Sequence, residues 1–190
     1  MADQLKVLVI CGSLRKKSYN AALTRALPEL VPPEMKLITA PPFDAFPLYN
    51  ADIQDSSGFP GPVNTLADAI RAADAVLFVT PEYNWSMPGV LKNAIDWISR
   101  MKEQPFEGKP VAIQSASQGP LGGARMQYHW RMSMTFVKAF IFGTPEVFVG
   151  SAQNKFDKDT LALTDQPTKD AVKAQLAAFA KFIKRMKAGA

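Results

Sequence analysis

Residues 12–20 carry side chains that are suited to binding a phosphate group. Arg15 has a planar guanidinium, which can donate to two oxygens of one phosphate. Ser13 and Ser18 add hydroxyl groups and Asn20 adds a carboxamide. The stretch lacks the glycine-rich dinucleotide fingerprint and the Gly-Lys-Ser/Thr ending of a P-loop. Two interpretations therefore stay open: a phosphate-binding loop, or a helix cap beside a solvent-exposed basic surface.

The single cysteine, Cys11, does not fit the role of a phosphatase nucleophile. A cysteine phosphatase needs a longer phosphate loop than the three residues that separate Cys11 from Arg15. Cys11 is therefore predicted to be a small, buried, apolar residue at the end of a strand. One cysteine and one histidine, His129, exclude an intramolecular disulfide and a thiolate or imidazole metal cluster. We expect no metal, and we interpret His129 as structural.

Two further polar segments are suited to holding a planar ring. In residues 81–86, peptide N–H groups around Glu82 to Asn84 are expected to reach the polar edge of the ring, which Tyr83 or Trp85 would border. In residues 117–125, Ser117 is expected beside the ring. Small residues there would let the backbone approach it: Gly119, Gly122 and Gly123. Ordinary packing of the aromatic residues and simple turn formation by the glycines remain alternatives. Flavin mononucleotide (FMN) has both the phosphate and the ring.

Apolar runs precede each of these polar segments and predict β-strands. The predicted strands are residues 7–10, 35–39, 75–80, 111–115 and 147–149. The third is apolar at nearly every position, which is typical of a central strand buried on both faces. Helical patterns cover residues 21–30, a segment from Val63 with Asn64 or Thr65 as its cap, residues 89–100, the segment after residue 125, and a C-terminal stripe from Val172 to Met186. Recurrent prolines predict irregular structure over most of residues 40–62.

Strands that alternate with helices predict a single α/β domain over residues 1–190. The expected architecture is a doubly wound, five-stranded parallel sheet of order 2-1-3-4-5 with helices on both faces. Ligands of such sheets bind at the carboxyl ends of the strands, near the switch between strands 1 and 3. The three polar segments are therefore predicted to converge into one composite site.

The same segments resemble the signatures of the NAD(P)H-dependent FMN reductase family, and most of all those of the soluble bacterial chromate and quinone reductases. The resemblance rests on Gly-Ser-Leu-Arg-Lys-Lys-Ser-Tyr-Asn at 12–20, on Pro-Glu-Tyr-Asn-Trp-Ser-Met-Pro-Gly-Val-Leu-Lys-Asn-Ala-Ile-Asp-Trp at 81–97 and on Ser-Gln-Gly-Pro-Leu-Gly-Gly-Ala-Arg at 117–125. It implies a flavodoxin-like fold and tightly held FMN. It also implies that NADPH or NADH, through FMN, reduces quinones, azo compounds, chromate or similar acceptors.

Carried over residue by residue, the resemblance implies a phosphate-binding group of Ser13, Arg15, Ser18, Tyr19 and Asn20. It implies a ring-binding group of Pro81, Glu82, Tyr83, Asn84, Trp85 and Ser117. The implied mechanism is ping-pong, in which nicotinamide and acceptor use the same place in turn. Because the cofactor supplies the difficult chemistry, we assign no catalytic acid or base.

The composition separates this function from its alternatives. A formal charge of +5 and a pI near 9.3 argue against a flavodoxin-like electron carrier, because such carriers are usually acidic. A nucleotide-binding regulator without flavin is the third possibility.

The basic residues are spread along the chain, and the C-terminal group Lys181, Lys184, Arg185 and Lys187 lies on an amphipathic helix, so we expect no nucleic-acid partner. Without an apolar signal region or a membrane span, a cytoplasmic location is expected.

The helix after the third polar segment has two apolar faces. Trp130, Met134, Val137 and Ile141 share one face, and Tyr128, Met132, Phe136 and Ala139 lie nearly opposite. A surface helix needs only one apolar face, so the second is expected to meet another subunit in a homodimer or homotetramer. Trp85 and Trp97 are expected to join that surface, and Arg125 to serve the interface or an anionic substrate. Cover by the proline-rich residues 40–62 is the alternative.

Overall fold

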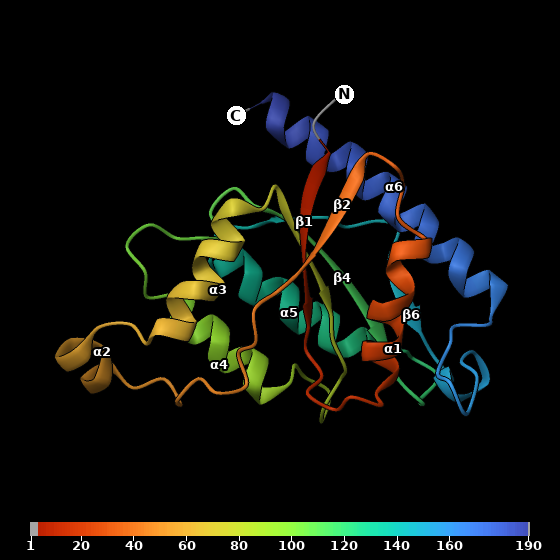
Figure 1. Ribbon diagram of the computed structural model, residues 1–190, viewed down its shortest axis with the longest axis horizontal. Helices are drawn as coiled ribbons and strands as arrows, with labels where there is room; N and C mark the ends of the chain where they lie inside the picture. Colours follow the sequence, from red (N-terminus) through yellow and green to blue (C-terminus); the bar gives the residue numbers. More distant parts are fainter. Residues whose placement is uncertain (1–3, 190) are drawn as a thin grey trace.

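The computed structural model describes residues 4–189, which form a parallel sheet between two layers of helices (Figure 1). The strands are β1 (Leu5–Cys11), β2 (Met35–Thr39), β3 (Ala75–Val79), β4 (Pro110–Ala116), β5 (Phe140–Ile141) and β6 (Val147–Val149). The helices are α1 (Tyr19–Ala26), α2 (Ala51–Ser57), α3 (Gly61–Ala72), α4 (Gly89–Ile98), α5 (Ala124–Phe136) and α6 (Gln166–Ala188), with short 3-10 turns η1 (Leu27–Glu29) and η2 (Ala152–Asn154).

The sheet order is β2-β1-β3-β4-β5, so the predicted doubly wound order is confirmed. The fifth position differs in detail, because two short strands share it. β5 pairs with Pro110 and Val111 at the start of β4, and β6 pairs with its end. Pro145, which has no N–H group to donate, interrupts the strand between them. The sequence pattern at residues 147–149 therefore predicted only the second half of the fifth strand.

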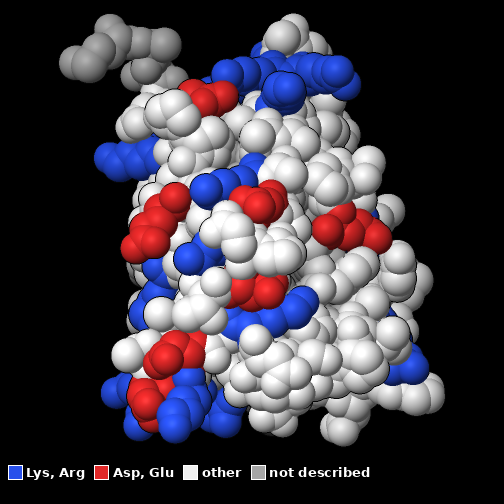
Figure 2. Space-filling view, turned by 90° about the vertical axis from the view of Figure 1, so that its right-hand side faces the viewer, with Lys and Arg blue, Asp and Glu red and all other residues white. Residues whose placement is uncertain are grey.

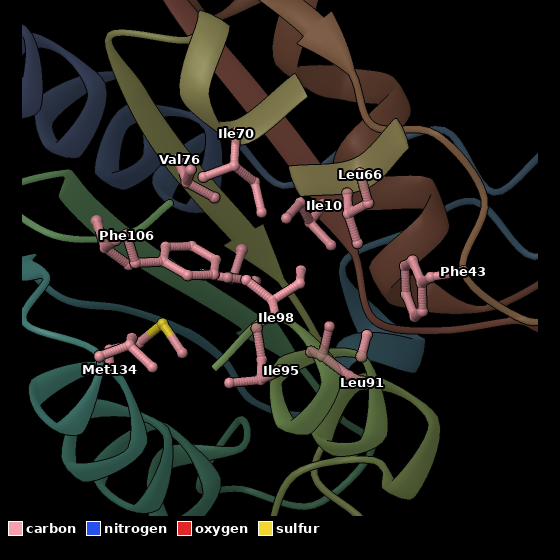
Figure 3. Close-up of a cluster of buried hydrophobic side chains, with 14 of the residues drawn as sticks. Ile10, Phe43, Leu66, Ile70, Val76, Leu91, Ile95, Ile98, Phe106 and Met134 are labelled. Atoms are coloured by element: carbon pink, nitrogen blue, oxygen red, sulfur yellow. The ribbon is translucent and has the colours of Figure 1, made fainter. Parts of the chain in front are cut away.

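Each face of the sheet is covered by its own helices. The helices α3, α4 and α5 pack on one face, around side chains such as Ile10, Val76 and Phe106 (Figure 3). The helices α1 and α6 pack on the other face, with Leu23 and Phe179 fully buried. Every residue of β3 is buried, as its unbroken apolar sequence predicted.

Several predicted boundaries shift for local reasons. The proline-rich segment contains α2, because no proline falls between Pro47 and Pro60. Pro60 is the N-cap of α3 and Pro62 lies in its first turn, where a missing N–H costs nothing, so the helix begins before the predicted caps at residues 64 and 65. The predicted helix 21–30 starts at Tyr19 and changes to the turn η1 at Leu27.

The proline-rich segment packs against α4 through a buried tryptophan. The indole N–H of Trp97 donates to the carbonyl of Pro47 over 2.8 Å, and Trp97 is fully buried. Trp97 is thus part of the core, and the prediction that it joins an intersubunit surface is wrong. Within residues 4–189, every helix is too short or too polar to cross a lipid bilayer.

Candidate functional site

The first loop runs from the end of β1 to the start of α1. Ser18 is the N-cap of α1, and its hydroxyl accepts from the N–H of Ala21 over 3.0 Å. The N–H groups of Tyr19 and Asn20, the first two residues of the helix, have no acceptor within residues 4–189. Arg15 is exposed and forms no ion pair with any carboxylate in the described part of the chain. The loop therefore offers unpaired N–H groups and a free guanidinium at a helix N-terminus, which suits an anion.

Close packing fixes where this loop leaves the sheet. A Cβ atom at Gly12 would lie 2.0 Å from Oγ1 of Thr80, so only glycine fits between the ends of β1 and β3. The Thr80 hydroxyl is buried and has no hydrogen-bond partner among residues 4–189. The preceding residue, Cys11, is half-buried, so it is more exposed than the predicted buried residue.

Two residues predicted to hold the phosphate have partners inside the protein. The side chain of Asn20 is buried and forms two hydrogen bonds with the backbone of Ala116 at the end of β4, each of 2.9 Å. The ring of Tyr19 packs against Phe156, with 5.4 Å between ring centroids. The Asn20 side chain connects the first loop to the third, and the backbone N–H groups of Tyr19 and Asn20 remain without an acceptor within residues 4–189.

The second loop is a tight hairpin at the end of β3. Tyr83 and Ser86 exchange two backbone hydrogen bonds of 2.9 Å, and the residues between them, Asn84 and Trp85, have φ angles of 51° and 63°. Two positive φ angles are the pattern of a type I′ turn, and for a residue as large as tryptophan this conformation is strained. Strain of this kind concentrates at functional sites.

The hairpin presents both hydrogen-bond donors and aromatic surface. The N–H groups of Glu82, Asn84 and Trp85 have no acceptor within the described residues. Tyr83 is 51% exposed and Trp85 is 65% exposed, whereas Pro81 at the base is buried. Unpaired N–H groups beside exposed aromatic rings suit a planar ligand with a polar edge.

The helix α5 holds this hairpin through three side-chain contacts. The Glu82 carboxylate accepts from the N–H of Met126 over 3.0 Å. The guanidinium carbon of Arg125 lies 4.5 Å from the centroid of the Trp85 ring, within the range of a cation–π contact. Nδ1 of His129 lies 3.3 Å from the hydroxyl of Ser86.

In the third loop, the hydroxyl of Ser117 donates to the carbonyl of Gly119 over 3.2 Å. A Cβ at Gly122 would lie 2.6 Å from the backbone of Phe148, and one at Gly123 would lie 2.8 Å from Ser115, and both glycines have positive φ. These two glycines are required by the packing of the protein on itself, whether or not the backbone there also approaches a ring. A Cβ at Gly119 would make only an ordinary contact, 3.8 Å from the hydroxyl of Ser117.

The three loops meet at the edge of the sheet where the strands end (Figure 1, lower edge). Gly12 touches Thr80 between the first two loops, Asn20 bonds to Ala116 between the first and third, and Glu82 bonds to Met126 just after the third. Sequence reasoning placed the loops together, but it did not identify Thr80 and the Met126 N–H. Thr80 is the one polar residue at the end of the apolar run 75–80, and this position could have indicated that it lies at the site.

A hollow of about 790 Å³ lies at the opposite end of the sheet, beside the C-terminal end of α6. Two of its basic side chains have partners in the protein: Lys109 donates to the carbonyl of Ala73, and Lys187 pairs with Asp74. Burial lowers the pKa of Lys109. On the α6 side of the molecule, basic side chains gather near this end, and acidic ones lie among the basic ones elsewhere (Figure 2). Lys109 and Lys187 are therefore already engaged within the protein.

The fold and the three loops define a flavodoxin-like, nucleotide-binding α/β protein with its site at the switch between β1 and β3. The family model for NADPH-dependent FMN reductase matches residues 5–154. The chain belongs to this family, as the resemblance of its motifs predicted, and it is an oxidoreductase that uses FMN and NADH or NADPH.

Individual relatives span nearly the whole chain. A quinone reductase of Escherichia coli (strain K12) is 49% identical, over 98% of this chain and 100% of its own length. An NAD(P)H-dependent FMN reductase of Pseudomonas aeruginosa is 48% identical over the same shares. Among solved structures, FerB of Paracoccus denitrificans, a flavoenzyme NAD(P)H:(acceptor) oxidoreductase, aligns with a TM-score of 0.85 at 33% identity, over 96% of this chain and 98% of its own.

Proposed function

We propose that this protein is a quinone reductase of broad acceptor range, which also reduces azo compounds, chromate or similar oxidants. The observation that carries the proposal is the convergence of three loops with unpaired donors at one sheet edge. The 49% identity to a quinone reductase supports the acceptor class. When bound, FMN supplies the redox chemistry, taking hydride from a reduced nicotinamide and passing electrons to the acceptor.

The donor set of the first loop fits the phosphate of FMN. Arg15 supplies a free, bidentate guanidinium, and the N-terminus of α1 supplies unpaired N–H groups at its positive end. Ser13 and Ser18 add hydroxyl groups. Tyr19 and Asn20 contribute through their backbone, because their side chains pack within the protein.

The hairpin and Ser117 fit the ring of FMN. Pro81 forms the buried base of the hairpin, and the N–H groups of Glu82, Asn84 and Trp85 are the donors available for a polar ring edge. Tyr83 and Trp85 expose aromatic faces on which a planar nicotinamide or quinone can stack. The residues of this proposed site are Ser13, Arg15, Ser18, Tyr19, Asn20, Pro81, Glu82, Tyr83, Asn84, Trp85 and Ser117.

A second copy of the chain is proposed to cover the outer face of α5, giving a homodimer or homotetramer. Tyr128, Met132 and Phe136 are 54%, 66% and 75% exposed, whereas Trp130 and Met134 on the inner face are fully buried. The proline-rich segment leaves this outer face open, so the alternative that it covers α5 is wrong. The helix ends at Phe136, and the other residues predicted for its faces, Val137, Ala139 and Ile141, follow it.

Initial-rate kinetics test the proposed function. A ping-pong enzyme gives parallel reciprocal plots when NADPH and a quinone are varied together, because nicotinamide and acceptor use one place in turn. A flavodoxin-like carrier gives no steady turnover with either nicotinamide, and this result would contradict the proposal. The need for a reduced nicotinamide also favours a cytoplasmic location, which cell fractionation can check.

A further inference from the structure

The helix α5 begins without a cap from its own sequence. Its N-cap residue is Gly123, which has no side chain and a φ of 89°. Helix N-caps normally supply a side-chain oxygen to the N–H of the second or third helical residue. Here the third residue is Met126, and its N–H donates to Oε2 of Glu82, 44 residues earlier, over 3.0 Å.

The packing around Gly123 prevents the helix from capping itself. A Cβ at this position would lie 2.8 Å from Cβ of Ser115 and 2.9 Å from its hydroxyl. The left-handed backbone there also disfavours serine, threonine and aspartate, the side chains that cap helices best. The carboxylate of Glu82 therefore replaces the missing cap, and its charge suits the positive end of the helix.

The same residue begins the hairpin of the proposed FMN site. The N–H groups of Glu82, Asn84 and Trp85 have no acceptor within residues 4–189, and the two backbone hydrogen bonds between Tyr83 and Ser86 set the shape of the hairpin but do not join it to the rest of the fold. The Glu82 side chain joins the base of the hairpin to a helix of thirteen residues. The contacts of Arg125 with Trp85 and of His129 with Ser86 join the rest of the hairpin to the same helix.

We propose that the Glu82 side chain has a positioning role: its carboxylate caps α5 and thereby aims the free hairpin N–H groups, including that of Glu82, at FMN, while the carboxylate itself does not contact FMN. This inference rests on the proposed FMN site and assigns a function to a side chain that faces the helix. Its specific consequence is that FMN affinity depends on the reach of residue 82 and on its acceptor atom more than on its negative charge.

Two conservative variants separate reach from charge. E82Q keeps the length of the side chain and an acceptor oxygen but loses the charge, whereas E82D keeps the charge and is one methylene too short to reach Met126. Titration of each apoprotein with FMN, followed by flavin fluorescence, measures the affinity. We expect E82D to weaken FMN binding by about tenfold, the loss of one charge-assisted hydrogen bond, and E82Q to stay within about threefold of the wild type.

A matched control separates positioning from general stability. Asp165 caps α6 in the same way, accepting from the N–H of Thr168 over 2.9 Å, outside the three loops. D165A is expected to lower the melting temperature at least as much as E82D and to leave FMN affinity unchanged. An equal loss of FMN affinity in E82D and D165A would overturn the inference. An E82D variant that binds FMN as tightly as the wild type would also overturn it.

The remaining outcomes are equally decisive. An E82Q variant as weak as E82D would mean that the negative charge of residue 82 governs FMN affinity, which contradicts the inference that reach and the acceptor atom do. A wild-type apoprotein that does not bind FMN would overturn the proposed function together with this inference. Normal binding by the wild type with no effect of E82D would overturn the inference alone.

Discussion

The carboxamide of Asn20 forms two hydrogen bonds with the backbone of Ala116, one in each direction and each 2.9 Å long. Asn20 lies in the first turn of α1, and Ala116 ends β4. The side chain thus satisfies a strand-end N–H and C=O that no neighbouring strand reaches. It fixes the first loop against the third, which begins at Ser117.

Removal of this side chain is expected to destabilise the protein. Asn20→Ala leaves the N–H and C=O of Ala116 buried without partners, so the free energy of unfolding should fall by about 2 to 4 kcal/mol. Urea denaturation measures the change. Asn64 is a matched control, because its exposed side chain makes one hydrogen bond of 3.2 Å, to Phe59. Asn64→Ala should cost less than about 1 kcal/mol, and equal losses would contradict the role assigned to Asn20.

Arg15 is expected to govern FMN retention more than turnover. Arg15→Ala removes a bidentate phosphate partner, so the dissociation constant for FMN should rise by about 10- to 100-fold. At saturating FMN, kcat should stay within about threefold, because Arg15 is assigned to the phosphate end of the cofactor. Lys16→Ala removes one neighbouring charge without the planar fork and should have a smaller effect. Unchanged FMN affinity in Arg15→Ala would remove the first loop from the site.

The exposed face of α5 is expected to control self-association. Phe136→Glu places a charge on a residue that is 75% exposed, so it should dissociate an oligomer without unfolding the subunit. Light scattering after size exclusion measures the mass. Leu48→Glu is the control, since Leu48 is 81% exposed but lies outside α5. A wild type that is monomeric at micromolar concentration would contradict the proposed interface.

Acid should weaken the cap of α6. Hydrogen bonds from the side chain and N–H of Thr168 lower the pKa of Asp165. A lowered folded-state pKa gives stability above the unfolded value of about 3.9, and this stability is lost as the pH falls through the folded pKa. The difference in melting temperature between wild type and D165A should therefore shrink from pH 6 toward pH 3. A constant difference would show that the charge of Asp165 does not contribute.

The sequence predicted the parts of the fold that depend on local patterns. The apolar run of β3 placed it at the centre, and Ser18 caps α1 as its residue type allowed. Local patterns could not predict partners that are distant in the sequence. The Asn20 side chain was assigned to phosphate because its partner, Ala116, is 96 residues away and cannot be identified from the local sequence. Trp97 was placed on the surface because Pro47, which accepts from its indole, lies 50 residues away.

The strand β5 was not predicted, because it too depends on a partner that is distant in the sequence. Its two residues, Phe140 and Ile141, are too few to show a strand pattern, and β4 alone gives them their register. The seven residues of α2 were hidden by the prolines on either side. For the site, the polar segments predicted the three loops, but local patterns could not show which donors remain unpaired, because this depends on every other contact in the fold.

The most direct test is an anaerobic titration of the FMN-loaded protein, followed by its visible spectrum. NADPH or NADH should bleach the yellow colour, and a stoichiometric amount of quinone should restore it. Arg15→Ala should show the same cycle only at FMN concentrations high enough to load it. A yellow protein that neither nicotinamide bleaches would contradict the assignment of a nicotinamide-dependent reductase.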